Sequence, residues 1–240
     1  MIKRPFAVFD IDGTVIRWQL YHALADELAR TGHLDPREFQ KVRAARMLWK
    51  KRAHETSFEE YERTLVALVD KAITGISVED LETACRGVID EYKDQVYTYT
   101  RDLIRDLQAK NYLLFAISAS QAQIVRLVAE YYGFDDCGGS EYEVKDGYFT
   151  GRKELLVSSA KPEFLKRLVA KHNAGWQDSY AIGDSDGDIP MLESVERPIA
   201  FNPTKKLFQH ARRHDWKIVI ERKNMVYELE PKDGKYALKN

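Results

Sequence analysis

Closely spaced acidic residues follow apolar runs at two places in this sequence. The stretch AVFDIDGTV puts Asp10 and Asp12 one residue apart, directly after an apolar run. The stretch GDSDGD at 183–188 adds further carboxylates, among them Asp184 and Asp188. A carboxylate that stays charged in a low-dielectric site is costly unless a partner neutralises it. The sequence therefore predicts a positively charged partner where these side chains meet.

A hydroxyl and an ammonium group occupy comparable places along the chain. Ser118 follows the apolar run Tyr112–Ile117, and Lys161 precedes the apolar run Ser179–Ile182. Ligands of open α/β sheets bind outside the carboxyl ends of the strands. We therefore expect Ser118, Lys161 and the carboxylates to gather at one edge of a sheet.

The combination of groups indicates phosphoryl transfer. Two carboxylates about 4 Å apart repel by roughly 4 kcal/mol at an effective dielectric of 20, and a divalent cation removes this repulsion. Oxygen ligands without His or Cys favour Mg²⁺. Ser118 lies just before a predicted helix, whose free N–H groups favour an anion. One carboxylate can act as nucleophile and its neighbour as general acid and base.

The elements that must position these groups alternate between strands and helices. We predict strands at Phe6–Phe9, Tyr112–Ile117, Ser179–Ile182, Pro198–Phe201 and Lys217–Ile220. Helical patterns separate them at Thr100–Lys110, Gln121–Tyr132, Pro162–His172 and Ile189–Val195. This alternation is typical of an α/β fold with a Rossmann-like parallel sheet. Residues 141–151 predict a hairpin with a tight turn at Asp146 and Gly147.

Residues 16–95 differ in composition and pattern from the rest of the chain. They are rich in charged residues with helical periodicity and contain no strand-like run. Helix start and stop signals divide this segment into several helices, as in a small inserted bundle. We therefore predict a core domain of residues 1–15 plus 96–222 and a helical cap of residues 16–95. We expect residues 223–240 to form a peripheral, partly disordered tail.

Composition excludes several classes of function. The chain has 240 residues, with 37 basic and 38 acidic side chains and a formal charge of −1, so no electrostatic footprint for nucleic acid or a membrane surface is expected. No apolar stretch approaches the roughly 20 residues that span a bilayer. The N-terminus lacks the apolar region of a signal peptide. Cys85 and Cys137 are expected to be free thiols, and the protein is expected to be cytoplasmic.

Four motifs together resemble the haloacid dehalogenase superfamily. They are DIDGT at 10–14, Ser118, Lys161 and GDSDGD at 183–188, in the order of that superfamily. The helical insert and the stretch DGYFTG at 146–151 resemble its phosphoserine-phosphatase-like subgroup, subfamily IB. The resemblance covers the chain up to about residue 222. It implies a haloacid-dehalogenase-type core with an inserted helical-bundle cap of the C1 type.

The resemblance also implies roles for individual residues. Asp10 would be the nucleophile and Asp12 the general acid and base. Mg²⁺ would be held by Asp10, the backbone carbonyl of Asp12 and Asp184, with Asp188 as a supporting carboxylate. In having an aspartate at position 12, the sequence resembles the phosphatases and phosphotransferases of the superfamily. The dehalogenases and phosphonatases of the superfamily lack a carboxylate at that position.

The substrate phosphate would be bound by Ser118 and Lys161, and we count Thr14 with them. The implied reaction is hydrolysis of a small-molecule phosphomonoester through an aspartyl-phosphate. Phosphoserine is one candidate among several, because the subgroup's glutamate nine residues after the nucleophile is Gln19 here. Alternatives are a phosphotransferase, a phospho-accepting signalling receiver and a catalytically idle binding module.

Two histidines stand apart from these motifs. His210 and His214 have the spacing HxxxH in the stretch HARRH. We expect a solvated basic helix rather than a zinc site, because the sequence suggests no third ligand.

Overall fold

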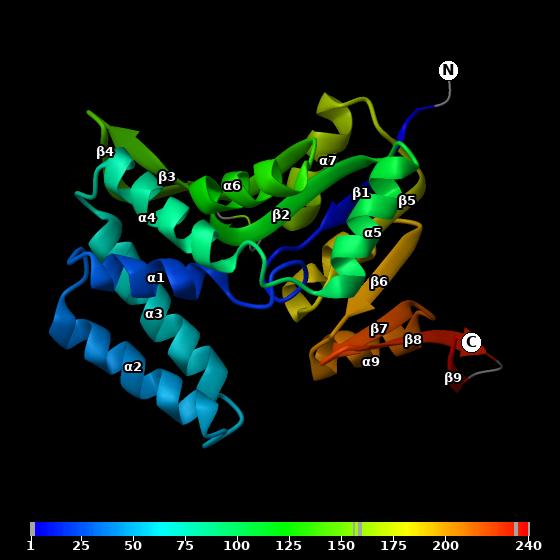
Figure 1. The fold of residues 1–240 in the computed structure, drawn as a ribbon, viewed down its shortest axis with the longest axis horizontal. Helices are drawn as coiled ribbons and strands as arrows, with labels where there is room; N and C mark the ends of the chain where they lie inside the picture. The colour runs from blue at the N-terminus through cyan, green and yellow to red at the C-terminus, as the bar shows by residue number, and fades with distance from the viewer. Residues whose placement is uncertain (1–2, 156, 158–159, 233–234, 240) are drawn as a thin grey trace. The chain divides into compact units, whose positions relative to one another are not determined.

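The computed structural model of the chain describes residues 3–155, 157, 160–232 and 235–239 (Figure 1). Contacts between residues divide the chain into two compact units. Unit 1 comprises Met1–Gln19, Tyr92–Ser140 and Leu156–Asn240, and unit 2 comprises Leu20–Glu91 and Glu141–Leu155.

Unit 1 is built on a largely parallel sheet. Its strands are β1 (Pro5–Phe9), β2 (Leu113–Gln121), β3 (Asp136–Lys145), β5 (Gly175–Gly183), β6 (Arg197–Phe201), β7 (Lys217–Arg222), β8 (Met225–Lys232) and β9 (Lys235–Leu238). Over the described residues, hydrogen bonds join the strands in the order β4-β3-β2-β1-β5-β6-β7-β8-β9. Strand β4 (Tyr148–Leu155) belongs to unit 2, and β3 passes from unit 1 to unit 2 after Ser140. Strand β1 lies between β2 and β5 and is parallel to both, with Val8 opposite Phe115 and Ala181. The predicted Rossmann-like parallel sheet is confirmed.

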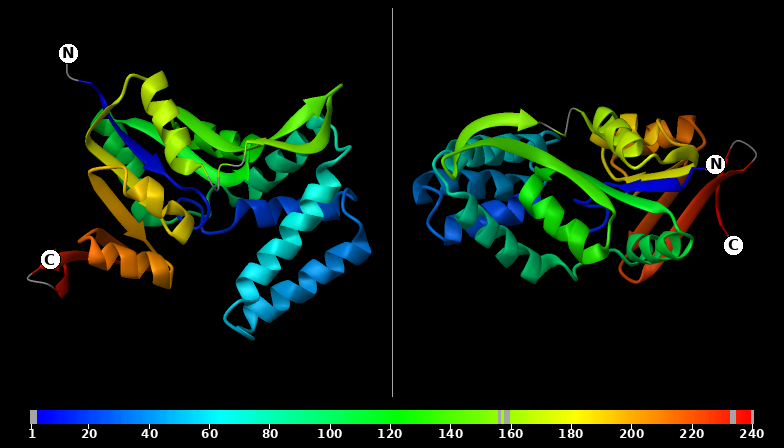
Figure 2. Two further views of the ribbon diagram at one scale, coloured as in Figure 1. Left: turned by 180° about the vertical axis from the view of Figure 1, so that it is seen from behind. Right: turned by 90° about the horizontal axis from the view of Figure 1, so that it is seen from above.

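Helices cover both faces of this sheet. They are α5 (Thr98–Ala109), α6 (Ala122–Tyr132), α7 (Lys161–Lys171), α8 (Ile189–Leu192) and α9 (Lys205–Arg213). Figure 2 shows α5 and α6 on one face and α7 and α9 on the other. Strand β1 is therefore buried from both sides, and the side chains of Phe6, Val8 and Phe9 have no exposed surface. This explains why β1 is a continuous apolar run rather than an alternating one.

Unit 2 contains α1 (Leu20–Arg30), α2 (Pro36–Lys50), α3 (Ser57–Ile73), α4 (Val78–Tyr92) and the hairpin of β3 with β4 (Tyr148–Leu155). The hairpin was expected in the core domain, but it is bonded to the loop between α3 and α4. Gly75 donates its N–H to the Phe149 carbonyl at 2.9 Å, and Phe149 donates to the Ile76 carbonyl at 3.0 Å. These backbone bonds hold the hairpin in unit 2.

The C-terminal segment also differs from the sequence-based expectation. The expected peripheral, partly disordered tail instead supplies β8 and β9, which extend the sheet in antiparallel fashion from β7. Tyr236 on β9 donates its hydroxyl to the Trp216 carbonyl at 2.7 Å. The segment is rich in charged residues, so its alternating apolar side chains were not recognised as strands. Among them, Leu229 and Leu238 pair across β8 and β9.

Two further expectations concern the whole chain. Cys85 and Cys137 are both free. Across the described residues, each helix is too short or too polar to pass through a bilayer.

Candidate functional site

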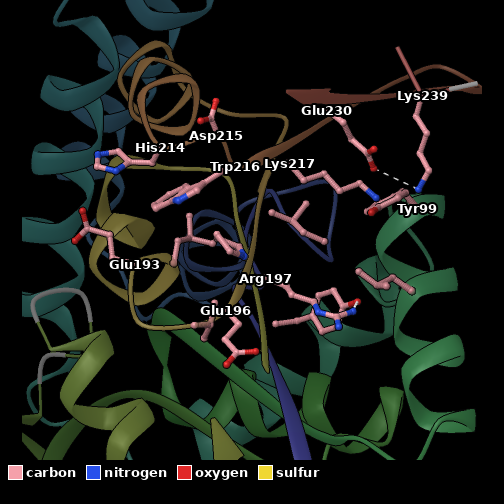
Figure 3. Close-up of a pocket in the computed structure, with 16 residues that line it drawn as sticks. Tyr99, Glu193, Glu196, Arg197, His214, Asp215, Trp216, Lys217, Glu230 and Lys239 are labelled. Carbon is pink, nitrogen blue, oxygen red and sulfur yellow. Dashed lines mark hydrogen bonds and ion pairs between the residues drawn. The ribbon is translucent and has the colours of Figure 1, made fainter. Parts of the chain in front are cut away.

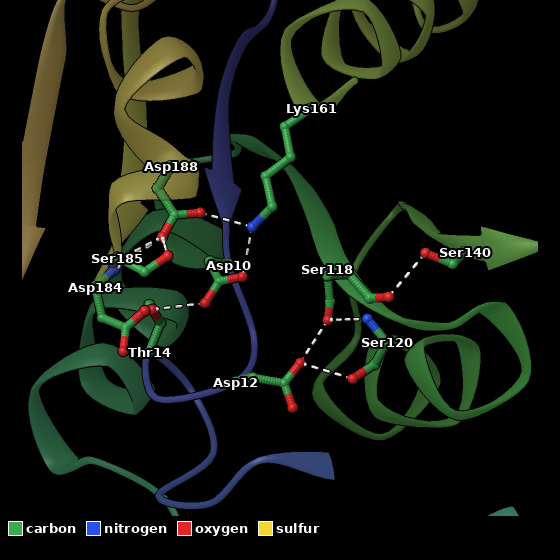
Figure 4. A network of polar contacts seen from close by, with 11 residues as sticks. Asp10, Asp12, Thr14, Ser118, Ser120, Ser140, Lys161, Asp184, Ser185 and Asp188 are labelled. Carbon is green, nitrogen blue, oxygen red and sulfur yellow. Dashed lines mark hydrogen bonds and ion pairs between the residues drawn. The ribbon is translucent and has the colours of Figure 1, made fainter. Parts of the chain in front are cut away.

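The carboxyl ends of adjacent strands bring the predicted acidic residues together. Asp10 directly follows β1 and donates its N–H to the Ile182 carbonyl of β5 at 2.9 Å. Asp184 directly follows β5. Asp10, Asp184 and Asp188 each offer one carboxylate oxygen, and these three atoms lie within 4.8 Å of one another. Figure 4 shows the three side chains. We call these three residues the acidic cluster.

Asp10 is held by two donors, one on each carboxylate oxygen. Lys161, the first residue of α7, places its Nζ 2.7 Å from Asp10 Oδ1 and 2.6 Å from Asp188 Oδ1. Thr14 donates its hydroxyl to Asp10 Oδ2 at 2.9 Å. These four side chains are all buried. The contacts fix the orientation of the Asp10 carboxylate from opposite sides.

Burial dominates the electrostatics of the site. It raises the pKa of Asp10 to about 7, with Lys161 opposing this shift and Asp188 and Asp12 adding to it. The pKa of Asp184 is also raised well above its usual range, by burial first and then by Asp10 and Asp188. Burial disfavours the charged form of Lys161, but Asp10 and Asp188 outweigh it and raise the pKa of its ammonium group. The single ammonium does not balance the carboxylates around it.

Asp188 organises the loop that carries Asp184. Its Oδ2 atom accepts hydrogen bonds from the Asp184 N–H at 3.2 Å, the Ser185 N–H at 3.0 Å and the Ser185 hydroxyl at 2.9 Å. A Cβ atom on Gly183 would lie 2.6 Å from the Asp188 Cβ and Cγ atoms. Gly183 is therefore required for Asp188 to approach the end of β5.

The turn after β1 brings Asp12 to the same edge of the sheet. The Ile11 carbonyl accepts hydrogen bonds from Thr14, Val15 and Ile16, which closes a tight turn. Gly13 adopts a φ of +81° within it, in the left-handed region. A Cβ atom on Gly13 would lie 2.3 Å from Asp184 Oδ2.

Two serines of β2 hold the Asp12 side chain. The hydroxyls of Ser118 and Ser120 both donate to Asp12 Oδ2, the latter at 3.0 Å. The Ser120 N–H donates to Ser118 Oγ at 3.0 Å. The expected position of Ser118 immediately before a helix is wrong, because β2 continues to Gln121 and α6 begins at Ala122.

The structure places the seven residues singled out from the sequence at one edge of the sheet. They are Asp10, Asp12, Thr14, Ser118, Lys161, Asp184 and Asp188 (Figure 4). Thr14 was expected on the phosphate, but its side chain is fully buried and its hydroxyl donates to Asp10. Sequence reasoning missed Ser120 and Ser185. Their one sequence signal was their position, since Ser120 lies two residues after Ser118 and Ser185 directly follows Asp184.

Comparison with known proteins agrees with this geometry. Residues 7–193 match the family model described as haloacid dehalogenase-like hydrolase. The chain is 27% identical over 221 residues to the inhibition of morphological differentiation protein of Streptomyces azureus, covering 91% of this chain and 79% of that protein. It is 25% identical over 201 residues to a phosphoserine phosphatase of Methanocaldococcus jannaschii, covering 83% of this chain and 86% of that protein.

Several other curated relatives are longer proteins, of which the chain spans about half the length. The fold is similar to that of a solved structure described as a phospho-aspartyl intermediate analogue of phosphoserine phosphatase. The two superpose with a TM-score of 0.61 at 21% identity, covering 92% of this chain and 95% of the other. The chain belongs to the haloacid dehalogenase-like hydrolases, and it is similar in sequence and fold to phosphoserine phosphatases.

Proposed function

We propose that this protein is a Mg²⁺-dependent phosphatase that hydrolyses a small-molecule phosphomonoester through an aspartyl-phosphate on Asp10. The observation that carries the proposal is the setting of Asp10. This carboxylate directly follows β1, is oriented by Lys161 and Thr14, and lies within ligand distance of Asp184. Asp12 stands two residues further along, where it can serve as the acid and base.

The donor set of the acidic cluster fits Mg²⁺. Its atoms are all carboxylate oxygens, and they lie close enough to share one ion. Asp10 and Asp184 would hold the ion with the backbone carbonyl of Asp12, and Asp188 would support them. The bound ion would neutralise the repulsion between the Asp10 carboxylate and an incoming phosphate.

The first chemical step forms the covalent intermediate. A carboxylate oxygen of Asp10 attacks phosphorus, and the bond between phosphorus and the ester oxygen breaks. The leaving oxygen takes a proton from the carboxyl group of Asp12. Lys161 stabilises the negative charge on the phosphoryl oxygens, and Ser118 contributes a hydroxyl donor near the phosphate.

The second step releases inorganic phosphate. Asp12, now a carboxylate, takes a proton from water as the water oxygen bonds to phosphorus. The bond between phosphorus and Asp10 then breaks, so both aspartates return to their starting states. Ser120, whose hydroxyl donates to Asp12 Oδ2, keeps the Asp12 side chain in place through both steps, and the Ser118 hydroxyl turns from Asp12 to the phosphate.

Similarity to phosphoserine phosphatases makes phosphoserine one candidate substrate. Position 19 is Gln where the subgroup has a glutamate. Other small phosphomonoesters therefore remain candidate substrates beside phosphoserine. A screen of phosphate release over phospho-amino acids, phosphocholine, sugar phosphates and nucleotides would rank them by kcat/KM.

The decisive experiment compares Asp10→Asn with the wild type. With Mg²⁺ and p-nitrophenyl phosphate, we expect the wild type to release phosphate and Asp10→Asn to lose at least about 10³-fold in kcat, because covalent catalysis is abolished. Asp186→Asn is the matched control, since Asp186 is on the same loop but contacts Thr204 and Lys206. Release that persists in Asp10→Asn, or after chelation of all divalent ions, would contradict the proposal.

A further inference from the structure

A second group of potential metal ligands lies in unit 1, away from the acidic cluster. Glu193, His210 and His214 each offer one ligand atom, and these atoms lie within 4.8 Å of one another. The HxxxH spacing of the two histidines by itself indicates no third ligand. The fold supplies it, because Glu193 directly follows α8 and lies beside the end of α9.

The helix geometry of α9 explains how the two histidines converge. His210 and His214 are four residues apart, so their side chains share one face of the helix end. Their rings stack with centroids 4.3 Å apart, and Trp216 packs against the His210 ring at 4.9 Å. The Trp216 ring also lies 5.9 Å from that of His214, so it packs against both histidines.

The Nε2 atom of His210 carries the strongest indication of a missing partner. Among the described residues, this atom is buried and has no hydrogen-bond partner. Glu193 Oε1 lies 3.0 Å from it, yet outside the direction that a ring N–H bond requires. A nitrogen and an oxygen that bind the same tetrahedral ion at about 2.0–2.2 Å lie at a similar separation without pointing at each other.

The nearby arginines do not occupy the site. Arg212 places its guanidinium over the Phe208 ring, 5.9 Å from the centroid. Arg213 donates from Nε to the Gln209 carbonyl at 3.3 Å. Both cationic groups therefore contact residues one turn back along α9 rather than the histidines.

The site opens to a pocket of about 630 Å³ at the amino ends of β6 and β7. Glu193, His214 and Trp216 line one side of this pocket, as Figure 3 shows. Its remaining walls include Arg197 and Lys217. A bound ion would thus be reached from solvent and could keep one coordination position for water.

We propose that Glu193, His210 and His214 form a binding site for one Zn²⁺ ion. Two neutral imidazoles and one carboxylate are a donor set that Zn²⁺ takes, with water completing a tetrahedral shell. The acidic cluster offers only oxygen ligands and favours Mg²⁺, so the two sites differ in metal preference. The zinc site does not depend on the proposed phosphatase reaction.

The test measures metal binding in the presence of excess Mg²⁺, which occupies the acidic cluster. Zn²⁺ is titrated into the metal-free full chain against a chromophoric chelator, and Co²⁺ is titrated separately as a spectroscopic probe. We expect the wild type and Asp184→Asn to bind one equivalent of Zn²⁺. We also expect the visible absorption of Co²⁺ to report nitrogen ligation in a low-symmetry site.

Substitution of the ligands should abolish this binding. His214→Gln and Glu193→Gln alter exposed residues and are expected to fold normally. Each substitution should weaken the affinity for Zn²⁺ by more than the roughly 10–100-fold loss that follows removal of an outer-shell partner. His54→Gln is the matched control, because His54 Nε2 also lies near a glutamate, 3.7 Å from Glu60 Oε2, but belongs to no three-residue ligand group among the described residues.

Two outcomes would overturn the proposal. The first is a wild type that binds Zn²⁺ no more tightly than His214→Gln, which would leave Glu193 and His210 as an ion pair only. The second is a Zn²⁺ equivalent that persists in His214→Gln but disappears in Asp184→Asn, which would place the ion in the acidic cluster. Phosphate release measured in the same samples separates this result from failure of the proposed function.

Discussion

The Asp10 carboxylate is restrained on both of its oxygens, by an ammonium on Oδ1 and by a hydroxyl on Oδ2. For the proposed nucleophile, such restraint fixes one orientation before substrate arrives, and positioning of the reacting groups lowers a reaction barrier. Lys161 also joins Asp10 to Asp188, so a single side chain links the residue after β1 to the loop after β5. At the scale of residues, the site is a set of short contacts between neighbouring strand ends.

Gly13 is a residue at which a small change should disturb the acidic cluster directly. We expect Gly13→Ala to displace the Asp184 carboxylate, because the new Cβ atom would lie 2.3 Å from Asp184 Oδ2. A displacement of about 1 Å can cost about 10²-fold in rate. We therefore expect at least that loss in kcat/KM for phosphate release, together with weaker Mg²⁺ binding measured by the shift in melting temperature.

Gly147→Ala is the control for backbone strain. Gly147 has a φ of +84°, close to that of Gly13, but a Cβ atom there would meet nothing within 4 Å. Both variants pay a similar conformational cost of about 1 kcal/mol, and only Gly13→Ala has the steric clash. Equal losses of activity in the two variants would show that strain, rather than contact with Asp184, is responsible.

At the scale of elements, α5 depends on a residue distant in sequence. Its N-cap residue, Tyr97, makes no side-chain capping bond. Instead, Glu221 of β7 accepts the N–H groups of Thr98 at 3.0 Å and Tyr99 at 2.9 Å. A buried carboxylate at a helix N-terminus satisfies free donors and interacts favourably with the helix dipole. This contact ties α5, which follows the inserted helices, to the sheet.

We expect Glu221→Gln to lower the free energy of unfolding by about 1–3 kcal/mol. Hydrogen bonds to charged groups are worth about 1.5–3 kcal/mol, and the glutamine amide group would turn a donor toward a donor. Chemical denaturation with constant m-value measures the change. Glu230→Gln removes an exposed ion pair with Lys239 and should cost at most about 1 kcal/mol. A similar loss in both variants would contradict the capping role of Glu221.

At the scale of the whole molecule, the two units have separate interiors and should respond differently to acid. In unit 2, His22 is buried among aromatic side chains, with its ring 4.9 Å from that of Tyr61. Burial, and then the charge of Arg46, lowers the pKa of His22 to about 4. Arg46 itself is held by Asp26 and Tyr61.

The folded pKa of His22 lies below its unfolded value of 6.5, so the unfolded state binds the proton more readily. The stability contributed by neutral His22 is therefore complete above pH 6.5 and is lost as the pH falls toward 4. The loss amounts to about 3 kcal/mol below pH 4. We expect the wild type to lose this stability relative to His22→Phe, which does not titrate.

Unfolding of both proteins between pH 7 and pH 4, followed by circular dichroism and calorimetry, measures the difference. If the units unfold in separate transitions, the difference should appear in the transition of unit 2. Parallel profiles for the wild type and His22→Phe would show that folding does not lower the pKa of His22, which would contradict the prediction.

Much of the fold could be predicted from the sequence because burial on both faces imposes a continuous apolar run. The run ending at Phe9 identified β1, and the parallel sheet followed from alternation with helical patterns. The segment after Lys223 was misjudged for the opposite reason. Strand β9 is the edge of the sheet and β8 lies next to it; strands at or near an edge keep charged side chains, so their composition resembles that of a loop.

The sequence by itself determined which residue types end each strand, and hence the family and the acidic cluster. Strand β1 must carry Asp10 outward at its carboxyl end, and neighbouring parallel strands share that edge. The contacts between distant segments were decided only by the tertiary structure. Examples are the approach of Glu193 to His210 and the hydrogen bond from the Thr98 N–H of α5 to Glu221 of β7. Strand order and helix packing determine which residues meet, and linear spacing does not encode them.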